Sequence, residues 1–403
     1  MGEKMNILQL TTYPLVEPIH GGQIRSKSIQ NHLKESGHNV INIAIYDPSS
    51  RFITNEHDIL FNPESKYYDL NNAIFLDYLT GQYATNTSEV YNKLVAHIEY
   101  NRIDTIFLEQ PWLYLVAKKL ADKFKLKIVY SSHNIEYRLK LSMLKDKKQL
   151  NEKTQNYISA IKNLEKDVVL NSDMIIGCTQ SDVNEFKKIL TDNGLETPVI
   201  LAGNGVQPFT ANKDDLNKWK NIFQKPYLTF IGSAHEPNSS GFWEMMYPGL
   251  TFLKPDEEVL VIGGVCDIIL NDKKFKVFDE LNRSRLHLLG KRDLADLQAI
   301  ILNSHLVILP ICEGEGSNLK TAEALESGRP IVATSKAFRG YEEAMKLNHV
   351  YIEDNPINFR QRIRSLLDEE RYDEGTDIGI KKIYYWNNQL KFIAPTLGKL
   401  FSK

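Results

Sequence analysis

Residues 310–330 read PICEGEGSNLKTAEALESGRP and combine a strand end, a glycine-bearing loop and a helix start. The apolar run at 306–309 predicts a buried strand, and the glycines that follow predict a sharply turning loop. A helix is expected to begin near Ser317 and to end at Gly328, because a proline two residues later prevents its continuation. A strand, a loop and a helix in this order are typical of an α/β fold.

The start of this predicted helix has the chemistry of an anion site. The N–H groups of Ser317, Asn318 and Leu319 should have no partner inside the helix, and the helix dipole attracts negative charge to them. Gly316 lets the backbone approach a ligand closely. Lys320 stands in the first turn, where the dipole alone disfavours a cation, so an anionic ligand would explain its position.

Two glutamates accompany this helix start. Glu315 and Glu323 are separated by seven residues, one in the loop and one inside the helix, and Glu323 shares a helix face with Lys320. A phosphate at the helix start would therefore have a carboxylate one turn further along, within reach of ribose hydroxyls. A plain strand–loop–helix connection with a solvated Lys–Glu pair explains the same residues equally well without a ligand.

Strands and helices alternate along most of the chain, which predicts doubly wound α/β architecture. The expected strands lie at 6–12, 40–46, 105–108, 127–131, 174–178 and 199–201, and then at 227–231, 259–262, 286–289, 305–309, 330–334 and 350–352. Between some of them lie helical patterns, at 23–36 and around 160–170. A chain of 403 residues is too long for one ordinary core, so two such domains are expected.

The boundary between the domains is expected at the Gly-Asn-Gly of residues 203–205, before a polar stretch. This gives an N-terminal domain at 1–205 and a C-terminal domain at 206–384. The remaining apolar pattern at about 385–403 predicts an amphipathic terminal helix that Pro395 should kink or interrupt. Crevices at the carboxyl ends of such parallel sheets bind ligands.

Composition restricts the class of protein. The chain has 49 basic and 51 acidic residues, so its net charge of −2 indicates neither a nucleic-acid nor a membrane partner. Cys178, Cys266 and Cys312 lie in or beside apolar runs, which predicts buried thiols in a reducing compartment. The N-terminus resembles no signal peptide, and no apolar run approaches the roughly 20 residues of a membrane span. A cytoplasmic protein is expected.

The pattern Glu315-x7-Glu323, within Gly-x-Gly-Ser-Asn-Leu-Lys and before Ser-Gly-Arg-Pro-Ile-Val, resembles the donor-binding motif of family 4 glycosyltransferases. The resemblance implies the GT-B fold, with two facing Rossmann-like domains, a cleft between them and a nucleotide-sugar donor as substrate. It implies that Glu323 holds the ribose, that Glu315 lies beside the transferred sugar, and that the amides of 317–319 take the pyrophosphate. Glu313 competes for the role of Glu315, since Glu-Gly-x-Gly also fits the common pattern.

Two further segments resemble the C-terminal domain of that family. Residues 227–238 are similar to its first strand and loop, where the family places an Arg and a Lys for the diphosphate. Here Ser233, His235 and Asn238 occupy the loop instead, which shifts the charge requirement to Lys320. Residues 288–297 are similar to the loop that holds the nucleotide base, which would place backbone groups around Gly290 and Lys291 against that base.

In the first domain, residues 18–25 follow the first expected strand and precede a helix. Gly21 and Gly22 permit close approach of the donor sugar or the acceptor, and the family carries a similar Gly-Gly with a following Arg. Arg25 would then meet a phosphate, or would form a surface ion pair. The resemblance also implies that the C-terminal helix returns to this first domain.

Residues 131–136, SSHNIE, follow another strand end. His133 resembles the histidine that the family places against the donor sugar, although a lone histidine is more often structural. Glu136 would orient this loop or form an ion pair with Arg138. The basic stretch 138–148 could touch an anionic lipid surface, and a solvated helix explains it as well.

The expected reaction is sugar transfer to an acceptor hydroxyl, with Glu315, His133 and Lys320 as the catalytic residues. The resemblance implies retention of the anomeric configuration and a glycan, lipid-linked or protein acceptor. No Asp-x-Asp pair is present, so a metal-bound diphosphate is not expected, and no other cofactor is implied. Two alternatives stay open: a nucleotide-sugar epimerase of the same fold, and a non-catalytic subunit that kept the fold.

Overall fold

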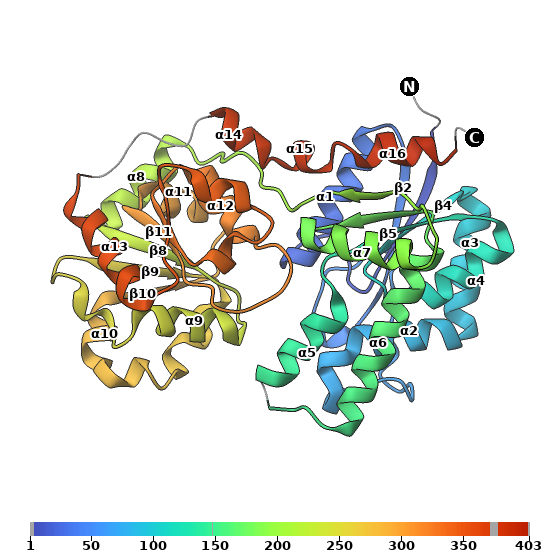
Figure 1. The fold of residues 1–403 in the computed structure, drawn as a ribbon, viewed down its shortest axis with the longest axis horizontal. Helices are drawn as coiled ribbons and strands as arrows, with labels where there is room; N and C mark the ends of the chain where they lie inside the picture. The colour runs from blue at the N-terminus through green and yellow to red at the C-terminus, as the bar shows by residue number, and fades with distance from the viewer. Residues whose placement is uncertain (1–3, 147, 371–377, 402–403) are drawn as a thin grey trace. The chain divides into compact units, whose positions relative to one another are not determined.

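Residues 4–146, 148–370 and 378–401 are described by the computed structural model of the chain (Figure 1). The chain divides into two compact units. Unit 1 consists of Met1–Gly203 together with Gln389–Lys403, and unit 2 consists of Asn204–Asn388. Each unit is an α/β structure with its own sheet and core.

The sheet of unit 1 is parallel throughout, and its order in the described residues is β3-β2-β1-β4-β5-β6-β7. The strands are β1 (Asn6–Thr11), β2 (Asn39–Tyr46), β3 (Ile59–Leu60), β4 (Thr105–Glu109), β5 (Lys127–Ser131), β6 (Met174–Gly177) and β7 (Val199–Leu201). The register pairs Leu10 of β1 with Ile43 of β2 and with Leu108 of β4. The order reverses between β1 and β4, which is the position where such sheets open a crevice for a ligand.

Helices connect these strands. They are α1 (Gly21–Glu35), α2 (Leu76–Asn86), α3 (Ser88–Asn101), α4 (Tyr114–Phe124), α5 (Glu136–Asp146), α6 (Glu152–Asn171) and α7 (Gln180–Asp192), with short 3-10 turns η1 (Pro48–Ser50) and η2 (Leu70–Phe75). Local sequence fixes several of their starts. Asn151 and Thr154 form a reciprocal capping box at α6, and Thr179 and Asp182 form another at α7.

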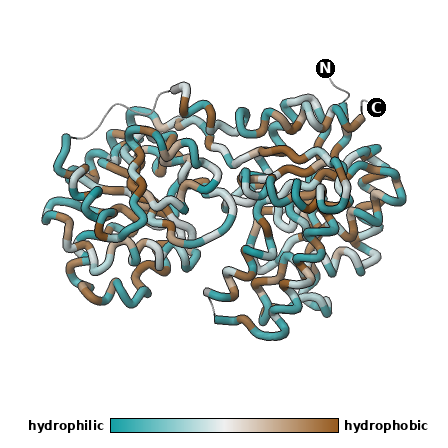
Figure 2. Tube along the Cα trace, viewed as in Figure 1, coloured by the Kyte–Doolittle hydropathy of each residue, from teal (hydrophilic) through white to brown (hydrophobic). Residues whose placement is uncertain are grey.

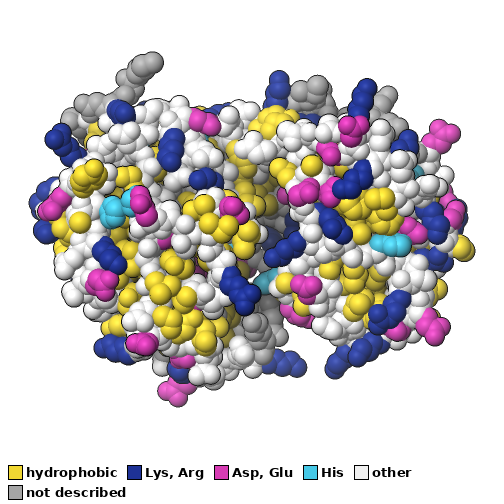
Figure 3. Space-filling model, turned by 180° about the vertical axis from the view of Figure 1, so that it is seen from behind, with side chains coloured by type: hydrophobic (Ala, Val, Ile, Leu, Met, Phe, Trp, Pro, Cys, Tyr) yellow, Lys and Arg dark blue, Asp and Glu magenta, His cyan; other side chains and the backbone are white. Residues whose placement is uncertain are grey.

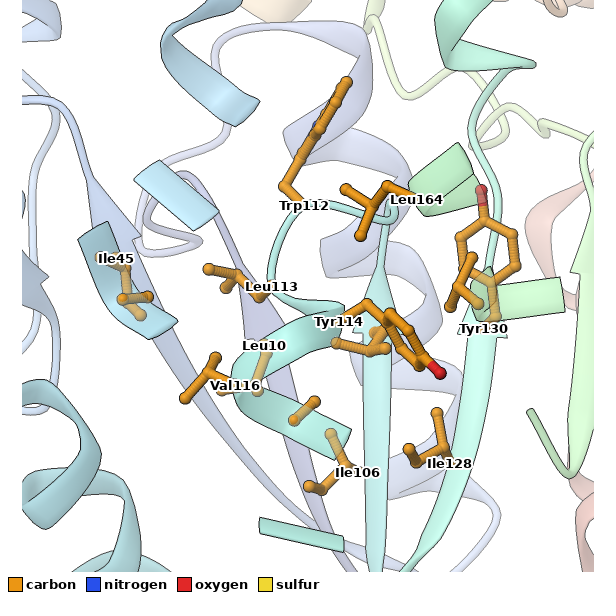
Figure 4. Close-up of a cluster of buried hydrophobic side chains, with 14 of the residues drawn as sticks. Leu10, Ile45, Ile106, Trp112, Leu113, Tyr114, Val116, Ile128, Tyr130 and Leu164 are labelled. Atoms are coloured by element: carbon orange, nitrogen blue, oxygen red, sulfur yellow. The ribbon is translucent and has the colours of Figure 1, made fainter. Parts of the chain in front are cut away.

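The strands of unit 1 are apolar on both faces because helices cover both. Figure 4 shows Leu10, Ile106 and Ile128 on three neighbouring strands, packed against Tyr114 and Val116 at the start of α4. Each fully buried side chain of this size contributes about 1.5–3 kcal/mol to stability. The same concentration of hydrophobic residues along the strands is visible in each unit in Figure 2.

Unit 2 contains a second parallel sheet, in the order β10-β9-β8-β11-β12-β13 over the described residues. Its strands are β8 (Tyr227–Ile231), β9 (Glu258–Ile262), β10 (Leu286–Gly290), β11 (Leu306–Leu309), β12 (Ile331–Ala333) and β13 (Val350–Ile352). Its helices are α8 (Lys213–Ile222), α9 (Glu236–Met246), α10 (Asp279–Arg285), α11 (Leu294–Asn303), α12 (Leu319–Ser327) and α13 (Pro356–Asp368). The 3-10 turns are η3 (Leu250–Phe252), η4 (Gly264–Asp267), η5 (Ile269–Asn271), η6 (Phe275–Phe278), η7 (Ser335–Phe338) and η8 (Glu342–Lys346). The order reverses between β8 and β11, so the loop of residues 310–318 follows a strand at the reversal.

Two local expectations need correction. The single terminal helix expected at about 385–403 is wrong, because the described residues of that range form two short helices, α15 (Trp386–Leu390) and α16 (Ile393–Lys399), and α14 (Ile378–Ile383) precedes them. Pro395 lies in the first turn of α16, where its missing N–H has no helical partner to lose. The cysteines differ as well: Cys178 is buried, whereas Cys266 and Cys312 are only half-buried.

Candidate functional site

The loop after β11 has a backbone that favours glycine. Gly314 has φ +117° and Gly316 has φ +70°, both in the region that residues with a Cβ rarely adopt. A Cβ at Gly314 would lie 3.1 Å from Nη2 of Arg339. Nε of Arg339 donates to the carbonyl of Gly316 at 2.9 Å, so this arginine holds the turn from outside.

The loop leads into the start of α12, which has no side-chain cap. α12 begins at Leu319, two residues later than expected, because Asn318 is still extended and serves as the N-cap. The Asn318 side chain makes no capping hydrogen bond. Its Nδ2 atom and the Oγ atom of Ser317 are buried and have no hydrogen-bond partner among the described residues. Unpaired buried polar atoms are costly, so these two atoms are candidate contacts for a polar ligand.

Lys320 joins this helix start to the loop after β8. Its Nζ donates to Oδ1 of Asn238 at 2.9 Å, and Nδ2 of Asn238 donates to the carbonyl of Ser233 at 3.0 Å. The approach of α9 to the loop depends on Gly241, where a Cβ would lie only 2.5 Å from the carbonyl oxygen of Pro310. The ammonium group of Lys320 thereby links the segment that follows β11 to the segment that follows β8.

Burial makes the charges of Lys320 and Glu323 sensitive to pH. Both side chains are half-buried on the same face of α12. Burial lowers the pKa of Lys320 to about 8, and Glu323 opposes that shift. Burial raises the pKa of Glu323 to about 7, and Lys320 opposes that shift. Both groups are therefore mainly charged only in a narrow range around pH 7 to 8.

The remaining predicted residues of unit 2 lie on neighbouring loops. Ser233 and His235 are exposed, and His235 precedes α9 without a side-chain cap. Gly290 ends β10 with φ +66°, and its carbonyl accepts from the N–H of Gly263 at 2.8 Å. No atom lies within 4 Å of a Cβ built at Gly290, so the space beside it is open. Lys291 is exposed at the same loop.

In unit 1, His133 is buried in a polar cluster at the ends of β1, β4 and β5. Its Nε2 lies 2.8 Å from Oε2 of Glu109, and its Nδ1 lies 3.3 Å from the hydroxyl of Tyr13. Gln9 donates to the other oxygen of Glu109 at 2.8 Å. This network assigns the ring proton to Nε2, which donates to Glu109, while Nδ1 accepts from Tyr13. Burial lowers the pKa of His133, and Glu109 opposes that shift.

Glu136 orients the loop that carries His133. Its Oε1 accepts from Nε2 of Gln110 at 3.2 Å and from Nδ2 of Asn134 at 3.3 Å. The alternative of an ion pair with Arg138 is wrong, because Arg138 pairs with Glu185 at 2.5 Å. Burial raises the pKa of Glu136 to about 7.

The glycines and the arginine of the first domain sit at the start of α1. Gly21 begins the helix, and a Cβ at Gly22 would lie 3.1 Å from the hydroxyl of Tyr13. Arg25 is 1% exposed, so the interpretation as a surface ion pair is wrong. Its charge opposes the burial-driven rise in the pKa of Asp182. A contact between Arg25 and a phosphate stays a prediction.

Comparison with known sequences bears on the unit that holds the uncapped helix. Residues 225–369 match the sequence family described as Glycosyl transferases group 1, and this range includes β8 to β13 and α12. Unit 2 contains a glycosyl transferases group 1 domain. The protein is therefore a glycosyltransferase, while its placement in family 4 remains a prediction. No curated protein sequence matches the chain.

Solved structures show that this glycosyltransferase has the GT-B fold. Sucrose-phosphate synthase from Thermosynechococcus elongatus is 14% identical and has a TM-score of 0.68, over 98% of this chain and 99% of that chain. Anabaena HepE in complex with UDP is 15% identical and has a TM-score of 0.67, over 98% and 100%. The catalytic domain of starch synthase IV from Arabidopsis thaliana, bound to ADP and acarbose, is 13% identical and has a TM-score of 0.63, over 99% of each chain. At such identities the likeness establishes the fold alone.

Within the glycosyltransferase domain, Glu313 and Glu315 both expose their side chains. Glu315 lies close enough to Arg339 to oppose the lowering of that arginine's pKa by burial. The choice of Glu315 over Glu313 stays a prediction. Sequence reasoning missed Arg339 and, in unit 1, Glu109. Their only sequence signal is a charged residue at or shortly after the end of an apolar strand.

Two of the four described cations in the basic stretch 138–148 form ion pairs. Lys140 is buried and forms an ion pair with Asp77 at 3.1 Å, and Arg138 is paired as described above. Lys145 and Lys148 are exposed, and Lys147 lies outside the described residues. Basic and acidic side chains are interspersed on the face shown in Figure 3. No helix of the described residues is long and apolar enough to cross a bilayer, and the same residues contain no cluster of three His, Cys, Asp or Glu with metal-binding geometry.

Proposed function

We propose that this glycosyltransferase moves a sugar from a nucleoside-diphosphate sugar to an acceptor hydroxyl, with retention of the anomeric configuration and without a metal ion. The observation that carries the proposal is the uncapped start of α12, where Ser317 Oγ and Asn318 Nδ2 are buried and unpaired beside Lys320. A diphosphate supplies the oxygens that these groups lack. UDP and ADP, bound by HepE and starch synthase IV, support a diphosphate ligand and leave the base open.

Each residue then has a defined part. The backbone N–H groups of 317–319 and the ammonium of Lys320 bind the diphosphate and stabilise the negative charge that develops as it departs. Glu323, one turn further along α12, accepts hydrogen bonds from the ribose. Glu315 binds hydroxyls of the transferred sugar. The contacts that Lys320 already makes with Asn238 keep its charge in place before the ligand arrives, which reduces the cost of reorganisation.

We further propose that Gly290 and Lys291 contact the nucleotide base through backbone groups, since the space beside Gly290 is open. Ser233 and His235 flank the diphosphate as the exposed part of the loop after β8. Gly21, Gly22 and Arg25 belong to the acceptor and phosphate side in unit 1. The acceptor is a glycan, a lipid-linked saccharide or a protein in a glycan-building pathway.

His133 can bind a sugar hydroxyl without losing its orientation. Its Nε2 is held by Glu109 at 2.8 Å, whereas the contact of Nδ1 with Tyr13 is longer, at 3.3 Å. A donor-sugar hydroxyl would therefore replace Tyr13 on Nδ1 and leave the Glu109 contact intact. Because the pKa of His133 is lowered, the neutral ring that accepts such a bond predominates at neutral pH.

The test is a donor panel of UDP-, ADP- and GDP-sugars, with release of nucleoside diphosphate measured with and without a saccharide acceptor. Acceptor-dependent release by the wild type, lost in Glu323→Gln and kept in the exposed control Glu343→Gln, is the expected result. NMR of the product should show the anomeric configuration of the donor. Epimer formation without acceptor would favour the epimerase, and nucleotide binding without turnover would favour a non-catalytic subunit.

A further inference from the structure

The side of the α12 start that faces β12 carries a cation that the predicted site did not include. Arg339 follows η7, six residues after the end of β12, and β12 pairs with β11 in register. Its Nε donates a hydrogen bond to the carbonyl of Gly316. Its Nη1 is buried and has no hydrogen-bond partner among the described residues.

The side chain of Arg339 is half-buried. The described residues give Arg339 no salt bridge, although Glu315 and Glu342 act on it from a greater distance. Burial lowers the pKa of Arg339, so its charge is held at a cost. Together with Ser317 Oγ and Asn318 Nδ2, Nη1 makes a third unpaired buried polar atom around one glycine loop. All three atoms belong to this loop and helix start or to the arginine that is hydrogen-bonded to the loop, so one polar ligand bound there would supply their partners.

Strand order puts the two cations on opposite sides of the helix start. The sequence of neighbouring strands is β8-β11-β12, and α12 follows the middle one. Lys320 is tied to Asn238 in α9, the helix after β8, and Arg339 comes from the loop after β12. The loop after β8 offers Ser233, His235 and Asn238 but neither Arg nor Lys.

We propose that Arg339 supplies the second positive charge of the diphosphate site: Nε fixes the Gly316 turn, and Nη1 donates to a diphosphate oxygen. This inference rests on the proposed function, since it assigns a ligand contact within the same site. Arg339 thereby replaces, from the β12 side, the cation that is missing from the loop after β8.

Glutamine separates the two roles of Arg339. The amide nitrogen of a glutamine occupies the same place along the side chain as the arginine Nε, so Arg339→Gln keeps a donor for the Gly316 carbonyl and removes the charge and Nη1. Arg339→Met removes both, and Arg339→Lys keeps the charge alone. Arg360→Gln is the matched control, because Arg360 is also half-buried in unit 2 and donates to the carbonyl of Met245, near the far end of α9.

The experiment is calorimetric titration of each variant with UDP, ADP and GDP, and with the monophosphate and nucleoside of whichever base binds best. Arg339→Gln and Arg339→Met should weaken the diphosphate by about 10- to 100-fold, the size of one charge-assisted contact. Nucleoside binding should not change, Arg339→Lys should recover part of the loss, and Arg360→Gln should match the wild type.

The outcomes distinguish this inference from the proposal beneath it. If Arg339→Gln binds the diphosphate with wild-type affinity and only Arg339→Met binds it more weakly, Arg339 acts only by holding the Gly316 turn. That result would overturn the proposed contact with the diphosphate. An equal loss of affinity for the nucleoside and for the diphosphate would also overturn the proposed contact. If the wild type binds none of the three diphosphates, the proposed function itself fails and the inference with it. Circular dichroism confirms that each variant is folded.

Discussion

Lys320→Met is the perturbation that most sharply separates a ligand-binding lysine from one that serves only to hold Asn238. Methionine keeps the unbranched apolar stem of the side chain and removes its charge and its donor to Asn238 Oδ1. If the ammonium binds a diphosphate, one charge-assisted hydrogen bond of about 1.5–3 kcal/mol is lost. That corresponds to a rise in Kd of about 10- to 150-fold for the nucleoside diphosphate near pH 7.5.

The pH dependence of nucleotide affinity is a second, independent test of the role of Lys320. Because the pKa of Lys320 is about 8, the wild type should lose affinity as pH rises above that value, by up to about tenfold per pH unit. Lys320→Met should show no such fall. At lower pH, both proteins should bind the nucleotide more weakly as Glu323 gains a proton. The variant should lose affinity at a higher pH than the wild type, because Lys320 lowers the pKa of Glu323.

Stability should change in the opposite direction to affinity. A lysine whose folded pKa lies below its unfolded value costs folding free energy while it is charged, and that cost disappears as pH rises from about 8 to above 10. Lys320→Met should therefore melt at a higher temperature than the wild type at pH 7 in the absence of nucleotide. Binding is measured by calorimetry from about pH 6.5 to about pH 9.5, with the exposed Lys346→Met as control. Unchanged affinity in Lys320→Met, or a wild type that is insensitive to pH above 8, would refute the reasoning.

Four further substitutions test the supporting structure. Gly241→Ala should lower the unfolding free energy of unit 2 by about 1–3 kcal/mol, because its Cβ would lie 2.5 and 3.3 Å from backbone atoms. Gly398→Ala in α16 should raise the unfolding free energy by about 0.4–1 kcal/mol, because its Cβ would meet no atom within 4 Å. Scanning calorimetry measures both, and identical melting of the two alanine variants would contradict the close packing of α9. Glu109→Gln should lower the pKa of His133 further, since the carboxylate is what opposes burial, and NMR titration that finds it unchanged or raised would contradict the assigned pairing. Arg102→Gly should raise stability by about 1 kcal/mol in denaturant titration, because Arg102 caps α3 with φ +50°, and a loss of stability would count against the left-handed cap.

The sequence was informative where chemistry is local. The apolar runs at 259–262 and 306–309 agree with the positions of β9 and β11, because strands buried on both faces are apolar throughout. The glycines at 314 and 316 predicted the turn, since positive φ selects them. The helix start was misplaced by two residues because Asn318 stays extended, a choice that depends on the turn before it.

What sequence could not supply is contact between distant residues. Lys320 and Asn238 are 82 positions apart and meet only because β8 and β11 are neighbours. Arg339 meets Gly316 through the pairing of β11 with β12, and Glu109 meets His133 through that of β4 with β5. The terminal helix failed for another reason: it is interrupted at residues 391–392, where the sequence has neither Pro nor Gly, and Pro395 lies inside α16 instead.

The most direct measurement is a crystal structure of the protein with the nucleoside diphosphate that binds it best. The account predicts diphosphate oxygens within hydrogen-bond distance of the amide nitrogens of 317–319 and of Lys320 Nζ, with the ribose on Glu323. A nucleotide bound elsewhere, with Ser317 Oγ and Asn318 Nδ2 still unpaired, would contradict it.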